Sequence, residues 1–135
     1  MNNHIDSINT QLAAACMLLS IADADEILED EEIQTIGEIL QDFFAIDKKT
    51  AKALIDQAQD KWNTSTGLFQ FGNQLNEKFS HNDKLDFISC VFEVAYADGE
   101  LHYLEHHTIK KIANILNLHR DEIIAAKAEI ENFLN

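Results

Sequence analysis

The chain reads Ala95-Tyr96-Ala97-Asp98-Gly99-Glu100-Leu101-His102-Tyr103-Leu104-Glu105, and a matching stretch lies 73 positions earlier: Ala22-Asp23-Ala24-Asp25-Glu26-Ile27-Leu28-Glu29-Asp30-Glu31-Glu32. Both copies have an Asp, then a Leu three positions later and a Glu seven positions later. A nearly continuous apolar run precedes each copy, and a stretch with apolar residues every three or four positions follows it. This order is typical of a buried helix, a turn and an amphipathic helix. The repeat therefore predicts two equivalent helical hairpins whose central apolar helices pack on each other.

Length and composition predict an all-α fold. The chain has 135 residues, of which 46% are hydrophobic, with no proline and four glycines. Chains so poor in Pro and Gly are usually helical, because turns in β proteins are rich in both residues. We expect a single domain over residues 1–135, folded as a compact bundle of about seven helices around the two central ones.

Periodicity and end signals place the seven helices. We expect a central helix at about 7–22, an amphipathic one at 30–44, and a third that Asp47 caps and that the polar stretch 63–67 ends. A fourth follows at about 68–79, where Gly72 marks a close helix contact. The stretch Ser80–Asp83 resembles a capping box and opens the second central helix, which runs to about 97 and is apolar almost all round. Two further helices, at about 103–116 and 121–134, are separated by Asn117 in the left-handed conformation.

Charge limits the classes of partner. The formal net charge is −14, which repels nucleic acid backbones and anionic membrane surfaces and suits cations and basic protein surfaces. The start of the chain does not read as a signal peptide, and no apolar run is long enough for direct membrane insertion. Cys16 and Cys90 lie in apolar helical stretches and are expected to be small buried hydrophobes. We therefore expect a cytoplasmic protein with a protein partner.

The acidic turns carry the strongest candidate site. Asp98 and Glu105, and by the internal match Asp25 and Glu32, place carboxylates at the start of an amphipathic helix in each hairpin. One interpretation is structural, since a Glu near the third helical position caps the helix and meets the positive end of its dipole. The other is a divalent metal site for Ca²⁺, Mg²⁺ or Mn²⁺, with Zn²⁺ less suited to carboxylates alone. Glu100, Asp23, His102 and His106 are weaker candidates for the same site.

A histidine cluster leaves an enzymatic alternative open. His102, His106 and His107 lie beside the second acidic turn, and the spacing of His102 and His106 can hold a metal ion if both are helical. A small metal-dependent hydrolase could combine these histidines with the acidic turns. Because no nucleophile motif, phosphate-binding loop or zinc-protease motif is present, we expect no enzyme and no catalytic residues. A third possibility, a structural subunit, would require a contiguous exposed apolar patch.

The motif around Asp98, followed by Glu105 and by Ile109, Ile112 and Leu116, resembles that of the TerB-like family, which includes tellurite-resistance proteins. The second copy fits the family pattern at every position, whereas Glu26 replaces the glycine of the first. The resemblance implies an all-helical fold of about seven helices with internal pseudo-symmetry. It also implies acidic residues that bind a divalent cation, and a role in stress response. We accordingly expect a non-enzymatic module that binds a cation or a protein partner through its acidic turns.

Overall fold

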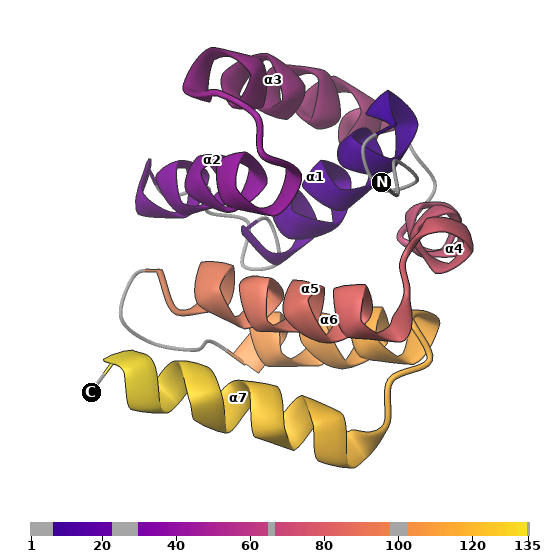
Figure 1. Ribbon diagram of the computed structural model, residues 1–135, viewed down its shortest axis with the longest axis vertical. Helices are drawn as coiled ribbons and strands as arrows, with labels where there is room; N and C mark the ends of the chain where they lie inside the picture. The colour runs from indigo at the N-terminus through magenta and orange to yellow at the C-terminus, as the bar shows by residue number, and fades with distance from the viewer. Residues whose placement is uncertain (1–6, 23–29, 65–66, 98–102, 135) are drawn as a thin grey trace.

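The computed structural model describes residues 7–22, 30–64, 67–97 and 103–134, which form seven helices and no strand. The helices are α1 (Ile8–Ala22), α2 (Asp30–Phe44), α3 (Lys48–Thr64), α4 (Phe69–Lys78), α5 (His81–Ala95), α6 (Tyr103–Ile115) and α7 (Arg120–Leu134). Figure 1 shows α3 at the top, α2 beside α1 beneath it, α5, α6 and α7 in the lower half and α4 at one side. The predicted all-α bundle is confirmed, and each predicted helix boundary lies within about two residues of the observed one.

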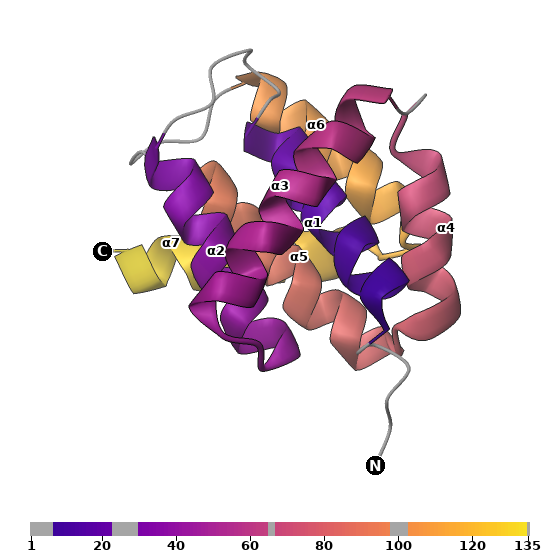
Figure 2. The ribbon, with the colours of Figure 1, turned by 90° about the horizontal axis from the view of Figure 1, so that it is seen from above.

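Helix α1 forms the centre of the bundle because nearly all of its surface is apolar. From Ala13 to Ala22 every residue is buried, and α1 packs against α2, α3, α4, α5 and α6. Figure 2 shows it crossing the middle of the molecule. Although α1 is apolar, it has 15 residues, and no helix within the described ranges is long and apolar enough to cross a bilayer.

Helix α5 is the second central helix, but it is less enclosed than its sequence predicted. One side is buried against α1 and α7, with Phe87, Val91 and Phe92 each at most 1% exposed. On the side that faces α2, Asp86 and Glu93 are exposed and Cys90 is half-buried. The expectation of a helix that is apolar almost all round needs this correction. Charged residues at these positions keep one strip of α5 in contact with water.

The predicted helix-end signals act as expected. Asp47 accepts a hydrogen bond from the Thr50 backbone N–H (2.7 Å) and caps α3. At the start of α5, Ser80 and Asp83 form a reciprocal capping box. Asn117 has φ +62° and ends α6. Because each signal acts through backbone groups only three or four residues away, the sequence predicts these boundaries well.

Helix bounds in the two halves of the chain repeat at nearly the spacing of the sequence motif. Helix α5 begins and ends 73 positions after α1, and α6 begins 73 positions after α2. Ala45 (φ +55°) and Asn117, which end α2 and α6, lie 72 positions apart, as do the first residues of α3 and α7. These spacings support two pseudo-symmetric hairpins, with one residue fewer between the start of α6 and its terminating residue. Helix α4 has no counterpart in this scheme.

The last two helices are anchored to different neighbours. Helix α7 is held along α5, where Glu122 pairs with His81 near one end and Glu131 accepts a hydrogen bond from the Tyr96 hydroxyl (2.6 Å) near the other. Helix α6 packs on α1 and α5 and is also tied to α4 by a hydrogen bond from Asn76 Nδ2 to the Ile115 carbonyl (2.7 Å). Gly72 of α4 also faces Ile115, with no room for a β-carbon, which confirms the predicted close helix contact. Consequently, these anchors do not draw α6 and α7 together.

Candidate functional site

The predicted metal ligands lie mostly outside the described residues, namely Asp23, Asp25, Asp98, Glu100 and His102. Glu32 and Glu105 are the third residues of α2 and α6, the position expected for Glu105. The side chain of Glu105 also lies outside the described part, so the distance between the two acidic turns stays open. Among described residues, no three His, Cys, Asp or Glu side chains gather closely enough to hold a metal ion.

Glu32 is distinctive because its carboxylate is enclosed at the start of a helix. The residue is 1% exposed, whereas its neighbours Asp30 and Glu31 are exposed. A buried carboxylate is stable only where its charge is compensated, and the first turn of a helix supplies such compensation through the helix dipole. This placement agrees with the structural interpretation of Glu32 and leaves its role toward a cation as a prediction.

His106 lines a cleft of about 540 Å³ between α6 and α7, here called the basic cleft. It is lined by three cationic side chains, His106, one amide and apolar residues: Phe92, His106, Ile109, Lys110, Asn114, Leu118, Arg120, Ile123, Ile124 and Lys127. Burial, together with Lys127 and Lys110, lowers the pKa of His106 below its ordinary value. Among the residues that the structure describes, no carboxylate lines this cleft. The acidic turn that the hydrolase alternative combines with this histidine lies outside the described side chains, so that alternative stays a prediction.

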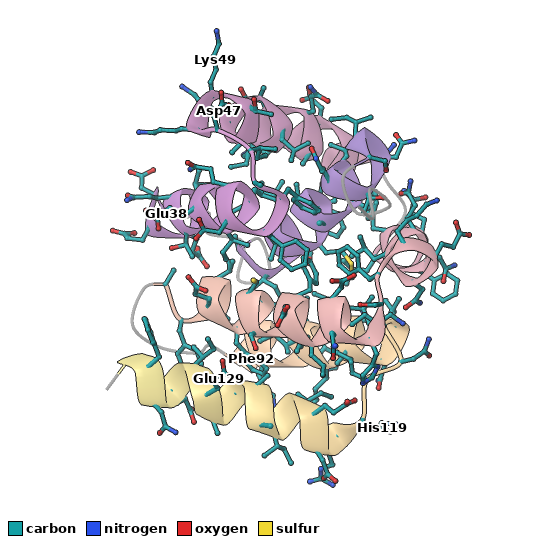
Figure 3. All side chains as sticks on the ribbon, in the orientation of Figure 1. Glu38, Asp47, Lys49, Phe92, His119 and Glu129 are labelled. Atoms are coloured by element: carbon teal, nitrogen blue, oxygen red, sulfur yellow. The ribbon has the colours of Figure 1, made fainter. Side chains whose placement is uncertain are left out.

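A second concave site lies between α2 and α5, here called the acidic groove. It encloses about 590 Å³ and is lined by Glu38, Ile39, Gln41, Asp42, Phe43, Asp83, Asp86, Cys90 and Glu93. Figure 3 places Glu38 on α2 and Phe92 between α5 and α7, so α5 separates the two sites. Five of the nine lining residues are acidic and none is Lys or Arg. The groove therefore concentrates negative charge that its own walls do not neutralise.

The electrostatics of Glu93 show that the two walls of the acidic groove repel each other. Burial raises the pKa of Glu93, and the negative charges of Glu38 and Asp42 on α2 raise it further. Asp83 differs from the others, because its carboxylate accepts a hydrogen bond from the Ser80 backbone N–H (2.9 Å) and caps α5. Four carboxylates thus remain to interact with a ligand. They are too dispersed to coordinate a single metal ion.

Neither cysteine has the properties of a catalytic nucleophile. Both are free thiols; Cys16 is buried and Cys90 is half-buried. Burial raises the pKa of Cys16 to about 11 and that of Cys90 to about 12, where nearby Glu93 and Asp86 add to the effect. A reactive cysteine requires a lowered pKa, because the thiolate is the nucleophile. The burial of Cys16 confirms its predicted role as a small core residue, whereas Cys90 lies at the wall of the acidic groove.

The acidic groove was not predicted, although the sequence contains a signal for it. Glu38 and Asp42 are four positions apart on α2, and Asp86 and Glu93 are seven apart on α5, so each pair lies on one helical face. Such faces are ordinarily solvated. They become one groove only because α2 and α5 pack side by side, which the charge pattern of either helix does not encode.

Comparison with protein families gives one match. The model of the family described as tellurite resistance protein TerB matches residues 11–128. Searches of curated proteins and of solved structures gave no match. The matched region runs from α1 into α7 and includes α4. It also contains both acidic turns, the acidic groove and the basic cleft.

Proposed function

The chain belongs to the TerB family, and we propose that it is a non-catalytic binding module whose acidic groove captures a basic segment of a protein partner. One observation carries this proposal: five carboxylates from two helices surround a concave site of about 590 Å³ without any lining Lys or Arg. Charge complementarity of this kind favours encounter with a cationic surface and selects against acidic ones.

The shape of the groove favours a peptide segment over a single ion. Its carboxylates are distributed along α2 and α5, so several Lys or Arg side chains of one segment could each approach a different carboxylate. Apolar contact is available as well, because the half-buried Phe43 ring is held against Phe79 (5.5 Å between centroids) and Phe87 (5.9 Å). A bound cation would also relieve the repulsion among Glu93, Glu38 and Asp42.

The family description connects the fold with tellurite resistance, and we propose a stress-related process of the same kind for this chain. Within that process the acidic turns would bind a divalent cation such as Ca²⁺, Mg²⁺ or Mn²⁺. The equivalent positions of Glu32 and Glu105, third in α2 and α6, support this part of the proposal. Calorimetric titration with each cation tests it. Binding that is absent, or unchanged in the variant with Asp98→Ala and Glu105→Ala, would leave the turns as helix caps.

The partner proposal is tested with a synthetic peptide rich in Lys and Arg, titrated into the full chain at low and moderate salt. The double variant Asp42→Asn with Glu93→Gln should bind roughly fivefold more weakly, since exposed ion pairs each contribute about 0.2–1 kcal/mol. The matched control Asp121→Asn with Glu129→Gln also removes two carboxylates, both exposed on α7, where Figure 3 labels Glu129, and should change affinity less than twofold. Equal effects in variant and control would assign the binding to net charge and reject the groove.

A further inference from the structure

The helix pairs α2–α3 and α6–α7 begin from the same type of turn but end in different packing. Beyond the left-handed Ala45, the Ile46 N–H donates to the Gln41 carbonyl (3.1 Å). Beyond Asn117, the Leu118 N–H donates to the Ala113 carbonyl (3.0 Å), at the same relative positions. Yet α2 and α3 pack closely, whereas over their described residues α6 and α7 make almost no close approach. Side chains, and not the turn, must cause this difference.

At two equivalent positions, the two helix pairs carry different types of residue. A β-carbon at Gly37 of α2 would lie at ordinary contact distance, 3.7 Å, from Ile55 Cδ1 of α3, and Ile55 is 6% exposed, so Gly37 faces a buried apolar side chain. By the spacing of the helix starts, Lys110 corresponds to Gly37 and Lys127 to Ile55. Two long cationic side chains therefore stand where the other pair has a glycine and an isoleucine. Both lysines line the basic cleft, which lies between α6 and α7.

The cleft has the chemical character of a site for an anion with an apolar body. Lys110, Arg120 and Lys127 supply the positive charge, and no carboxylate of the described part of the chain is among the lining residues. The floor is apolar, with Phe92 and Ile109 each 1% exposed. Burial, Lys127 of α7 and Lys110 of α6 all lower the pKa of His106. Positive charge from both helices therefore lies near this one side chain.

We propose that the basic cleft binds a small amphipathic anion, in which a phosphate or carboxylate head group is joined to an acyl or comparable apolar chain. The lysines and Arg120 would hold the head group, and the apolar floor together with Ile124, which is 55% exposed, would cover the chain. This proposal uses a different face from the acidic groove and does not depend on the proposed function.

A small ligand fits better than a macromolecular one. The volume of about 540 Å³ is within the range of roughly 300–1,000 Å³ typical of pockets for small molecules. A nucleic acid or an anionic bilayer would also meet the rest of a chain with net charge −14, which repels extended anionic surfaces. A short monoanion or dianion enters the cleft without meeting that surface.

The test is a titration of the full chain with octyl phosphate and octanoate below their micelle concentrations, followed by two-dimensional NMR of backbone amides. Two compounds are titrated in parallel as controls. Inorganic phosphate has the charged head group without the apolar chain, and octanol has the chain without the charge. We expect both amphiphiles to shift residues of α6 and α7 around the cleft, and to bind at least roughly tenfold more tightly than phosphate or octanol. Which amphiphile binds more tightly identifies the preferred head group. No binding, or shifts centred elsewhere, would overturn the proposal.

Variants of the protein test the contacts to the head group and the contacts to the apolar chain separately. The double variant Lys110→Gln with Lys127→Gln should weaken octyl phosphate binding roughly tenfold or more, as expected for lost charged hydrogen bonds. Ile124→Ser should weaken octyl phosphate but leave the response to inorganic phosphate unchanged. Lys49→Gln removes one positive charge at the start of α3, far from the cleft (Figure 3), and should change affinity less than twofold. If Lys49→Gln is as damaging as the double variant, the binding is non-specific and the cleft is not the site.

Discussion

The α2–α3 and α6–α7 pairs occupy equivalent places in the two halves of the chain. In the first pair the helices pack together, here called closed, and in the second a cleft lies between them, here called open. Both turn through a left-handed residue and a matching backbone hydrogen bond. In the closed pair Gly37 faces the buried Ile55, whereas in the open pair Lys110 and Lys127 line a cleft. The comparison indicates that equivalent positions can either pack together or line a cleft while the backbone turn is retained.

A second contrast lies on the two sides of α5. The acidic groove and the basic cleft enclose similar volumes, about 590 and 540 Å³, but their lining charges have opposite sign. In each, like charges face one another from two helices. Although the net charge is −14, charges of opposite sign gather in different places. The acidic groove is suited to cationic ligands and the basic cleft to anionic ones.

The largest expected effect distinguishes the closed pair from the open pair. Ile55→Ala should lower the free energy of unfolding by about 2–5 kcal/mol, because it creates a cavity beside Gly37 in the core. Lys127→Ala, at the corresponding position of α7, should change it by less than about 0.5 kcal/mol, as for a residue outside a packed core. Urea denaturation followed by circular dichroism measures both. Similar losses in the two variants would show that the α6–α7 pair is packed like its counterpart.

Two helical glycines should respond in opposite directions. Gly72→Ala would place a β-carbon in collision with Ile115 and should destabilise the protein by about 1–3 kcal/mol. Gly37→Ala would bring its β-carbon into ordinary contact with Ile55 and should stabilise by up to about 1 kcal/mol, since Ala is the better helix former. Thermal unfolding of both variants measures the two changes in stability. Stabilisation by Gly72→Ala would mean that α4 and α6 are not held together at this point.

An apolar residue in place of Lys127 in the open α6–α7 pair should raise the free energy of unfolding and weaken ligand binding. Lys127→Ile places at this position the residue type found at Ile55 and should raise the free energy of unfolding by up to about 1 kcal/mol, because it lets α7 bury more apolar surface. The same variant should lose affinity for octyl phosphate. Lys49→Ile, which adds an exposed isoleucine on α3, should give no such gain. A destabilised Lys127→Ile variant would contradict the role assigned to the lysine pair.

The smallest effect concerns the acidic groove and depends on pH. The pKa of Glu93 is raised, so the folded state binds its proton more readily than the unfolded state, and stability from this group is lost as the pH rises above about 4.5. Glu93→Gln should therefore stabilise the protein at pH 7 by about 0.5 kcal/mol, a value reduced by solvent screening of this exposed residue. Its advantage should disappear as the pH falls toward 4. Urea denaturation across this pH range tests the sign, and a constant difference would mean that Glu38 and Asp42 do not act on Glu93.

Local signals predicted the helices well because each acts over a few residues. Ser80 with Asp83, Asp47 and Asn117 mark helix ends through bonds to nearby backbone groups, and the structure confirms all three. Gly72 also predicted a close contact, since a glycine inside a helix is unfavourable without a packing reason. Prediction was less complete for α5. Its apolar composition did not show that Asp86 and Glu93 would lie together beside α2.

Sequence alone determined the seven helices and the buried centre at α1, because periodicity and capping are properties of neighbouring residues. Only the tertiary structure decided which helices close against each other and which leave a concave site between them. That outcome depends on pairs distant in the sequence, such as Glu38 with Glu93 and Lys110 with Lys127. Their charges are visible in the sequence, but whether they face a solvent boundary or one another follows from helix packing, which no local pattern encodes.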